Sequence, residues 1–500
     1  MMMAQEQAIL KGREQFDRMV AMVRRASEQG REIHQVEKDL WQGVLQLGLV
    51  LLEGFVQGQG TGDLGPTLEQ EGRTLHRLDE PHGRRYVSVF GELPPIRRHV
   101  YGTRETQKHE VVPLDARLNL PEGDFSYLLQ EWDQALCVQG SYAESAASVQ
   151  RVLGLGQSVR SLEQMTGSMA QSVEAFRAAQ PPPPAKDEGA ILVLTADCKG
   201  VPMRREAEEA AGKEPGGRRS KGQKANKKRM AAVGGVYTVD PFVRRADDVV
   251  DEVMREAARE GRPVPQGKQL RAELTRQIDG REVNGKDRIF AWFQEQAERR
   301  NPAGSEPSKP VVCVMDGERA LWKRLSACFV GVVCILDLFH VLERLWQAAH
   351  CFCPEGSDQA RAFVTERLRR LLQGQAGRVI GGLRQMATKR KLRGPKRRQL
   401  ESAVAYLANN RRFMRYDQYL AAGYPIGSGV AEGACRHLVK DRMEQTGMRW
   451  RTPGAQAMLD LRAVYLNDQW ERFNADRVER ECNRLYPHRE AVQSQWSLAA

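Results

Sequence analysis

The 500-residue chain lacks the closely paired cysteines that crosslinked or zinc-binding domains use. Its nine cysteines are scattered, and no two of them form a Cys-x-x-Cys pair. This spacing excludes a disulfide framework and an ordinary zinc ribbon. Free thiols of this kind are typical of a reducing compartment, so we expect the protein in the cytoplasm.

Long apolar runs are also missing. The longest stretch, residues 47–56, is interrupted by Gly48 and Glu53, and it is shorter than the roughly 20 apolar residues that cross a bilayer. Residues 1–6 lack the charged and apolar regions of a secretory signal. The sequence therefore predicts no membrane partner.

Acidic residues are too few to balance the basic ones. The chain has 76 Lys and Arg against 64 Asp and Glu, a formal net charge of +12. Excess positive charge favours a polyanionic partner such as nucleic acid, although a solvated basic surface gives the same count. The length exceeds one ordinary core and predicts about two to four domains.

The pattern divides the chain into eight segments. Residues 181–184 are consecutive prolines, which favour a stiff, extended chain and mark the clearest boundary. In order, the segments are an N-terminal helical region (1–62), a small β-containing segment (63–130), a helix-turn-helix-like region (131–180), a linker (181–186), the first part of an α/β domain (187–340), a helical insertion (341–421), the last part of that domain (422–466) and a polar, peripheral tail (467–500).

Two patterns stand out in the first 130 residues. Apolar residues at helical spacing predict one long helix over residues 5–58. Alternating residues over 86–93 and, after two prolines, over 96–102 predict a β region. Neither pattern indicates a function by itself.

The third segment resembles two helices around a tight turn. We expect one helix over residues 143–153, a turn over 154–156, and a second helix capped by Ser158. Arg160 and Gln164 lie on the expected second helix, where a helix-turn-helix reads DNA. Two short helices around glycines also occur in ordinary α domains, so both interpretations stay open.

After the linker, strands and helices alternate, which predicts a layered α/β domain. Apolar runs end at Asp197 and at Asp316, so both carboxylates are expected at strand ends. The other expected elements are a strand over 231–239, helices over 243–260, 269–298 and 318–327, a strand over 330–336 and nearly continuous helix over 338–421.

A polar segment between the first two of these strands is rich in basic residues. Such a loop could grip a phosphate backbone, although a plain surface loop has the same composition. The candidates for DNA contact are Arg218, Arg219, Lys221, Lys224, Lys227, Lys228 and Arg229.

Carboxylates from separate strands and a later helix could converge on one point. Glu432 follows a glycine-rich turn that opens an expected helix, while Asp197 and Asp316 end strands. Oxygen ligands of this kind hold Mg²⁺, and two such ions can assist phosphoryl transfer. Asp337 and His340 follow the last strand. They are either a helix cap with a packed histidine or part of the same site.

Four stretches together resemble the DDE-type transposases of bacterial insertion sequences, most closely the ISKra group. The resemblance covers residues 187–466 well and the N-terminal third loosely. The matching stretches are Thr195–Met203, Val314–Glu318, Asp337–His340 and Tyr424–Glu432, the last continuing into Lys440–Trp450.

The resemblance implies a fold and a site. The fold is a ribonuclease-H-like α/β catalytic domain interrupted by an all-α insertion and preceded by a mainly helical DNA-binding region with a small β segment. Asp197, Asp316 and Glu432 would ligate two Mg²⁺ ions, for which Mn²⁺ can substitute, and Asp337 and His340 would act beside them.

The resemblance also implies partners. They are double-stranded DNA, as the element's terminal inverted repeats and the target, and at least a second copy of the chain, in the bacterial cytoplasm at the nucleoid. Relatives often carry paired cysteines before a Pro-Leu-Asp sequence. No cysteine precedes Pro113–Asp115 over residues 103–112, so a zinc module there would be degenerate.

Basic and aromatic residues after the third carboxylate are further candidates for DNA contact. They are Lys440, Arg442, Arg449 and Trp450. Trp450 either stacks on an unpaired base or belongs to the core. Glu444 is the competing carboxylate of this region, but basic residues surround it.

Two other functions remain open from the residues. One is a ribonuclease-H-like nuclease or resolvase that cuts DNA without strand transfer, which the long N-terminal region and the insertion disfavour. The other is a catalytically idle DNA-binding protein derived from a transposase, which the intact carboxylates disfavour.

Overall fold

The computed structural model divides into two compact units. The N-terminal unit holds Met1–Phe176 together with Gln469–Ala500, and the sheet unit holds Arg177–Asp468. Each unit is described by itself. The residues that the structure describes are 2–70, 72–103, 110–204, 228–255, 261–302, 304, 308–445 and 447–499.

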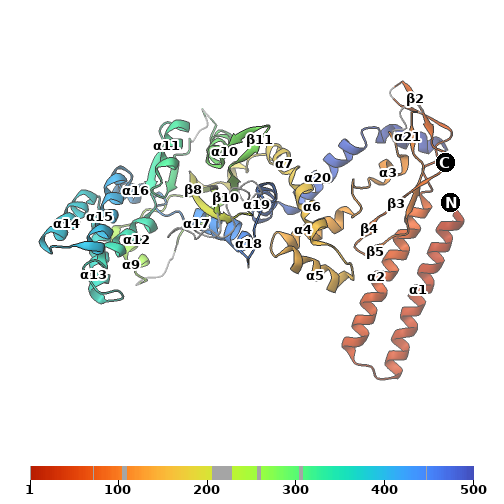
Figure 1. Ribbon diagram of the computed structural model, residues 1–500, viewed down its shortest axis with the longest axis horizontal. Coiled ribbons are helices and arrows are strands. Elements are labelled where there is room, and N and C mark those ends of the chain that lie inside the picture. Colours follow the sequence, from red (N-terminus) through yellow and green to blue (C-terminus); the bar gives the residue numbers. More distant parts are fainter. Residues whose placement is uncertain are drawn as a thin grey trace, which may run out of the picture. The chain divides into compact units, whose positions relative to one another are not determined.

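The N-terminal unit begins with a helical hairpin, not with the single long helix that the sequence predicted. Helix α1 (Met2–Glu28) and helix α2 (Ile33–Gly58) run antiparallel, as Figure 1 shows. The turn uses Gly30, whose φ of 61° lies in the left-handed region that glycine tolerates. Apolar periodicity alone does not show a turn of this kind, because both helices keep an apolar face.

The predicted β region of this unit is confirmed but larger than expected. It forms a three-stranded sheet in the order β1-β2-β7 and the pairs β3-β6 and β4-β5. The strands are β1 (Thr67–Gln70), β2 (Arg73–Arg77), β3 (His82–Arg84), β4 (Val87–Ser88), β5 (Gly91–Glu92), β6 (Ile96–Arg98) and β7 (Tyr101–Gly102).

Helices complete the N-terminal unit, and the last two come from the end of the chain. The segment after residue 467 is not peripheral, because Phe473 and Arg477 are almost fully buried there. The sequence predicted a peripheral tail because most residues of this segment are polar, and the helices bury only one narrow face. The helices are α3 (Pro113–Leu118), α4 (Tyr127–Cys137), α5 (Tyr142–Leu153), α6 (Val159–Ala170), α20 (Trp470–Leu485) and α21 (Arg489–Ala499). Helix α7 (Val173–Ala179) spans the boundary between the units.

The sheet unit is mixed α/β and is built on five strands in the order β10-β9-β8-β13-β14. Strands β10, β9 and β8 are antiparallel neighbours, whereas β8, β13 and β14 are parallel. The strands are β8 (Ile191–Pro202), β9 (Lys228–Val239), β10 (Gln266–Leu274), β13 (Val311–Met315) and β14 (Val333–Leu336).

Two expected helices are wrong in part. Residues 269–283 form β10, β11 (Arg276–Ile278) and β12 (Arg281–Val283), and helix follows only in α10 (Gly285–Arg300). Residues 270–274 pair with β9 and are all buried, and Leu270, Ala272 and Leu274 alternate with Arg271 and Glu273 as in a strand. Of the helix expected over 243–260, the structure has α9 (Ala246–Val253), and residues 256–260 lie outside the described residues.

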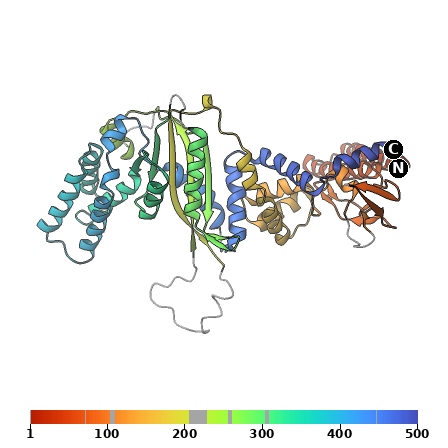
Figure 2. The same ribbon diagram turned by 90° about the horizontal axis from the view of Figure 1, so that it is seen from above.

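Helices cover both faces of the sheet. A Cβ at Gly234 would lie 2.8 Å from Ile289 of α10, whereas a Cβ at Gly235 would lie 3.1 Å from Val430 of α17 (Gly429–Ala434). Neighbouring strand residues point to opposite faces, so α10 and α17 lie on opposite sides of β9. Figure 2 shows α10 lying along the strands.

The helical insertion is confirmed. It packs on β14 through two phenols: Tyr416 donates to the Leu336 carbonyl (2.8 Å) and Tyr419 to the Cys334 carbonyl (2.9 Å). The helices are α12 (Leu338–Ala349), α13 (Asp358–Leu372), α14 (Ala376–Lys389), α15 (Gly394–Asn409) and α16 (Tyr416–Ala421), after α11 (Arg319–Cys328) between β13 and β14.

The chain then returns to the sheet. After α17 come the π-helix η3 (Cys435–Lys440), α18 (Asp441–Met443) and α19 (Thr452–Leu466), which packs along β10. In the part of the chain that is described, α2 alone is long and apolar enough to cross a membrane by length and composition.

Candidate active site

Three aspartates lie along one edge of the sheet, the edge at which the parallel strands β13 and β14 end. They are Asp197 on β8, Asp316 directly after β13 and Asp337 directly after β14. The residues that precede them are partners in the parallel register, so the three aspartates stand at the same level on adjacent strands. The carboxyl ends of parallel strands are the usual place for a binding site in α/β proteins.

The sequence predicted that Asp197 ends its strand, and this prediction is wrong. Strand β8 runs on to Pro202 because β9 continues to pair with it, while its parallel neighbour β13 stops at Met315. Thr195 lies on the face that Val430 of α17 covers. Side chains two residues apart point to the same face, so Asp197 also faces α17.

Backbone and thiol donors hold the Asp197 carboxylate. The Cys198 N–H donates to Oδ1 (2.6 Å), and the Cys435 thiol donates to Oδ2 (3.3 Å). Burial and the neighbouring Asp197 raise the pKa of Cys435 above its usual range, so the sulfur keeps its proton. Cys435 comes three residues after Glu432, which places both side chains on one side of the helical run.

Asp316 is held by the loop that follows β13. The Glu318 N–H donates to its Oδ1 (3.0 Å), while the Gly317 N–H donates to the hydroxyl of Tyr406 (3.1 Å). Tyr406 comes from α15, so the insertion reaches the carboxylate edge. Glu318 itself forms an ion pair with Lys286.

Asp337 ties three elements together. Its fully buried carboxylate caps α12 by accepting from the His340 N–H (3.0 Å), and Oδ2 lies 2.6 Å from Nδ1 of the same histidine. Its other oxygen accepts from the Ser428 N–H (2.7 Å), at the start of α17. The cap that the sequence suggested is therefore present, and it also anchors the helix that carries Glu432.

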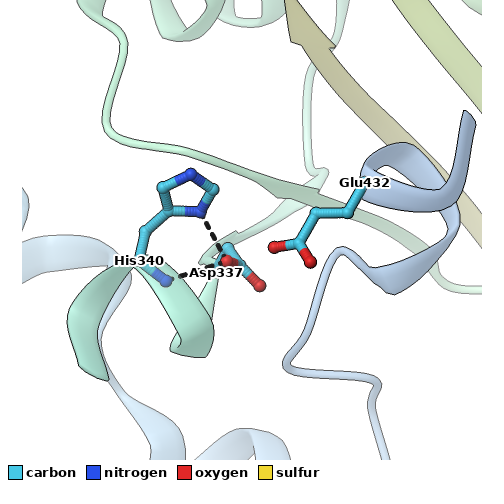
Figure 3. Close-up of side chains that lie close together, drawn as sticks. All are labelled: Asp337, His340 and Glu432. Atoms are coloured by element: carbon cyan, nitrogen blue, oxygen red, sulfur yellow. Dashed lines mark hydrogen bonds and ion pairs between the residues drawn. The ribbon is translucent and has the colours of Figure 1, made fainter. Parts of the chain in front are cut away.

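Glu432 lies against this pair. Ligand atoms of Asp337, His340 and Glu432 all lie within 4.8 Å of one another, as Figure 3 shows. Among the described residues, Asp197, Asp316 and Glu432 do not form a group this compact. The hydrogen bond from the Ser428 N–H holds the start of α17 beside Asp337.

Burial, with a smaller contribution from neighbouring negative charge, raises the pKa values of the acids at this edge. Burial raises the pKa of Asp316, and Asp197 adds to the effect. Burial likewise raises the pKa of Glu432, with a contribution from Asp337. The hydrogen bond that His340 donates to Asp337 raises the pKa of His340 to about 9, so the imidazole is cationic near neutral pH.

The donor set fits a hard divalent cation. Carboxylate oxygens suit Mg²⁺ and Mn²⁺, and a cation would relieve the repulsion that raises the pKa of Asp316 and Glu432. Both oxygens of Asp337 already accept hydrogen bonds. Both oxygens of Asp197 accept hydrogen bonds as well, so the bonding does not select the ligands, and the choice of Asp197, Asp316 and Glu432 stays a prediction.

A pocket of about 440 Å³ opens beside this edge, and sequence reasoning missed it. Glu432 lies at its border, and its lining is largely apolar. Among the residues that line it are Tyr237, Phe242, Val249, Phe339, Tyr424 and Ile426. They come from distant parts of the chain, so no local pattern could have marked them.

The predicted recognition helix is present. Ser158 caps α6 by accepting from the Ser161 N–H (3.0 Å), and Arg160 and Gln164 are exposed on that helix. Helices α4, α5 and α6 pack on one another, and the Gln134 amide of α4 donates to the Leu162 carbonyl. The two expected helices and the turn between them are thus present, while a DNA-reading helix-turn-helix stays a prediction.

Two of the expected DNA contacts are wrong, because Arg442 and Trp450 are buried. The Trp450 indole N–H donates to the Met443 carbonyl (3.1 Å), and its backbone N–H donates to the Pro202 carbonyl (3.0 Å) at the end of β8. The Arg442 guanidinium lies 5.0 Å from the Trp450 ring. Trp450 is therefore a core residue.

The remaining basic candidates divide between exposed and undescribed positions. Lys440 and Arg449 are exposed. At the start of β9, Lys228 pairs with Glu444 (2.6 Å) and Arg229 donates to the Thr452 hydroxyl. Because Lys228 neutralises Glu444, Glu432 is the better candidate ligand. Arg218, Arg219, Lys221, Lys224 and Lys227 lie outside the described residues.

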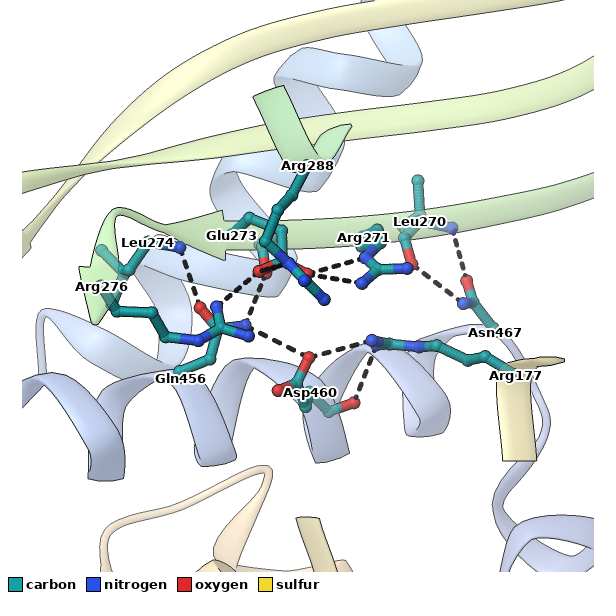
Figure 4. Close-up of polar contacts among 11 residues, drawn as sticks. Arg177, Leu270, Arg271, Glu273, Leu274, Arg276, Arg288, Gln456, Asp460 and Asn467 are labelled. Carbon is teal, nitrogen blue, oxygen red and sulfur yellow. Dashed lines mark hydrogen bonds and ion pairs between the residues drawn. The ribbon is translucent and has the colours of Figure 1, made fainter. Parts of the chain in front are cut away.

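A second buried acid, Glu273 of β10, was not foreseen (Figure 4). Three arginines form ion pairs with it: Arg271 (2.7 Å), Arg276 (2.5 Å) and Arg288 (3.1 Å). Burial raises the pKa of Glu273, but the arginines lower it more, so the pKa lies below its usual range.

Comparison with known proteins adds no identity. The chain matches no model of a known protein family, and it matches no curated protein.

Proposed function

We propose that the chain is a DDE-type transposase, similar to those of the ISKra group, that cuts and joins DNA with Mg²⁺. One observation carries the proposal. Asp197, Asp316 and Asp337 stand in register at one sheet edge, and Asp337 draws the helix of Glu432 to the same edge through Ser428.

The arrangement of the sheet unit supports a ribonuclease-H-like fold. Three antiparallel strands precede two parallel ones, in the order β10-β9-β8-β13-β14. A run of helices, α12 to α16, then separates β14 from α17. Both features agree with the resemblance, in which a helical insertion lies between the last strand and the glutamate.

Each residue of the edge has a distinct task. Asp197, Asp316 and Glu432 would hold Mg²⁺. When bound, the ions activate the attacking oxygen and stabilise the leaving one. His340, cationic near neutral pH, presents positive charge to a phosphate through Nε2, because Asp337 holds Nδ1. Water as the attacking group gives a nick, and a 3′-hydroxyl gives strand transfer.

The DNA-binding part of the proposal rests on charge and exposure. The chain carries a net charge of +12, and Arg160 and Gln164 are exposed on α6, where Ser158 caps the helix. We assign the terminal inverted repeats to this helix and the phosphates near the cut to Lys440 and Arg449. Joining of two DNA ends requires at least two copies of the chain. We place the reaction in a bacterial cytoplasm.

The test uses DNA that carries the repeats flanking this gene. Purified chain with Mg²⁺ should nick the repeat end, and a pre-cut end should join to a plasmid. Glu432→Gln should abolish both products. Glu444→Gln is the matched control, because Glu444 is the nearby carboxylate that Lys228 neutralises, and it should keep both activities.

The rival functions give different products. Nicking without joining of a pre-cut end would make the chain a nuclease or resolvase. Specific binding to the repeats with no Mg²⁺-dependent product would make it an idle DNA-binding protein. Equal loss of activity in Glu432→Gln and Glu444→Gln would contradict the assignment of the glutamate.

A further inference from the structure

Helix α2 carries an apolar stripe that no described residue covers fully. The stripe contains Trp41, Val44, Leu51 and Phe55, and each of these side chains is about half exposed. Together with position 48, they are spaced alternately by three and four residues, which makes a seven-residue repeat. Gly48 occupies the remaining position of this repeat, and a Cβ there would lie 2.5 Å from the ring of Phe90. Phe90, itself partly exposed, thus fills the gap in the stripe.

Helix α1 adds a second apolar stripe. Ile9, Phe16 and Val23 are seven residues apart and exposed. The seven-residue repeat of both stripes is the pattern by which one helix packs on another in a coiled coil. The two helices pack on each other beside these stripes, since Gly12 lies against Leu51 and Gly54 lies against Ala8. Leu51 belongs to both surfaces, because it touches α1 and is still half exposed.

The two stripes lie on the same side of the hairpin. On α1 the exposed stripe lies about 80° around the helix axis from the residues that face α2. On α2 the exposed stripe lies about 100° around the axis from the residues that face α1. Both rotations have the same sense when each helix is viewed along its own chain direction. Because the helices are antiparallel, equal senses of rotation place both stripes on one flank. We call the seven residues Ile9, Phe16, Val23, Trp41, Val44, Leu51 and Phe55 the apolar flank.

The opposite flank of α1 is basic. Lys11, Arg18 and Arg25 are also seven residues apart, and all three are exposed. A second copy of a chain with net charge +12 would be repelled there. On the apolar flank the seven residues are uncharged, and the repeat of α2 continues to an exposed acid, Glu37, so this is the side on which two basic copies can meet.

The apolar flank is large enough for a dimer contact. If each half-exposed side chain loses roughly 80 Å², the flank buries about 560 Å² on each copy, or about 1,100 Å² in total. That total lies just below the range of stable specific interfaces, where weak association is usual. A two-fold axis suits it, because a hairpin with one apolar side is half of a four-helix bundle.

We infer that the apolar flank of α1 and α2 is a self-association surface, through which two copies of this chain form an antiparallel four-helix bundle. The inference does not depend on the carboxylate edge, so it stands whether or not the chain cuts DNA.

The experiment measures the mass of the full chain in solution, after nuclease treatment and without DNA, which could otherwise bridge two copies. Sedimentation at concentrations on the order of 10 μM should show a species of twice the 56.4 kDa monomer. Phe16→Lys and Phe55→Lys should each shift the chain to monomer. Leu10→Lys is the matched control, because Leu10 has the same 56% exposure as Phe16 but lies off the flank, and it should leave the dimer intact.

Three outcomes would overturn the inference. The first is a wild-type monomer at every concentration. The second is a dimer that Phe16→Lys and Phe55→Lys leave unchanged while their circular dichroism matches the wild type. The third is flotation of the wild type with lipid vesicles that both variants abolish, because the flank would then contact a membrane.

Discussion

Two acidic sites of the sheet unit differ in their counter-charges. At the edge of β10, Glu273 meets three arginines, and its pKa is lowered. At the carboxyl ends of β8, β13 and β14, several carboxylates share one imidazolium, that of His340, and the pKa values of Asp316 and Glu432 are raised.

The difference separates an acid that serves the fold from acids that can bind a cation. A buried acid that three arginines neutralise gains less from a bound cation, and removal of one partner leaves charge unpaired. Carboxylates that lack counter-charges store repulsion, which a divalent cation releases. Glu273 therefore serves as a comparison residue, on the same sheet, for the carboxylates of the candidate site.

The largest expected effect is the loss of activity in Asp316→Asn. We expect cleavage and joining to fall by roughly 1,000-fold or more, because one charged ligand at the site of phosphoryl transfer is removed. The pKa of Asp316 is above its unfolded value, so its charged form lowers stability at neutral pH. Thermal unfolding should therefore show equal or higher stability. A strong loss of stability would mean that Asp316 serves the fold.

The next largest effect is a loss of stability with activity retained, the reverse of the effect expected for Asp316→Asn. Glu273→Gln leaves three arginines without their shared carboxylate, and we expect the free energy of unfolding to fall by about 2–4 kcal/mol. Activity per folded molecule should stay near the wild-type value at low temperature. Denaturant unfolding and a cleavage assay on the same sample measure both quantities. Abolished activity in a folded sample would remove the contrast between the two sites.

A smaller effect is stabilisation by the metal ion. Millimolar Mg²⁺ should raise the free energy of unfolding of the wild type by about 1–3 kcal/mol through binding to the folded state. Glu432→Gln should lose most of this increase, whereas Glu273→Gln should keep it. Thermal melts with and without Mg²⁺, at constant ionic strength, give the comparison. Equal stabilisation of all three proteins would argue for weak, unspecific binding.

The smallest effect concerns a third acid, which shows that a raised pKa alone does not mark a site. Asp133 of α4 is fully buried, and burial raises its pKa to about 7. Its folded pKa exceeds the unfolded value of about 3.9, so stability falls as pH rises between them. Asp133→Asn should stabilise the chain by roughly 1–2 kcal/mol at pH 8 and by much less near pH 4. A pH-independent effect would mean that the pKa of Asp133 is the same in the folded and the unfolded chain, so that burial does not raise it.

Local patterns predicted much of the fold. Strand β13, helix α6 with its Ser158 cap and the helical insertion are formed by short-range spacing, which the sequence displays directly. Predictions were wrong where a distant neighbour changed the outcome. Residues 269–274 became a strand because β9 offers them partners, and the helix expected over 5–58 was split by a turn at Gly30.

The candidate site divides in the same way. Asp197, Asp316, Asp337 and His340 were predicted from apolar runs that end in polar residues, and the register of the strands brings the three aspartates to one level. The bond from Ser428 to Asp337, the Cys435 thiol on Asp197 and the Tyr406 hydroxyl join elements far apart in the chain. No spacing in the sequence could have shown them.

The sequence by itself determined which residues can be acids at strand ends, because an apolar run that stops at Asp316 needs no partner to be recognised. The tertiary structure decided which acids remain without counter-charges. Glu444 is close to Glu432 in sequence, yet Lys228 neutralises only Glu444. Charge compensation acts over a few ångströms in space, and that distance is fixed only when strands and helices pack.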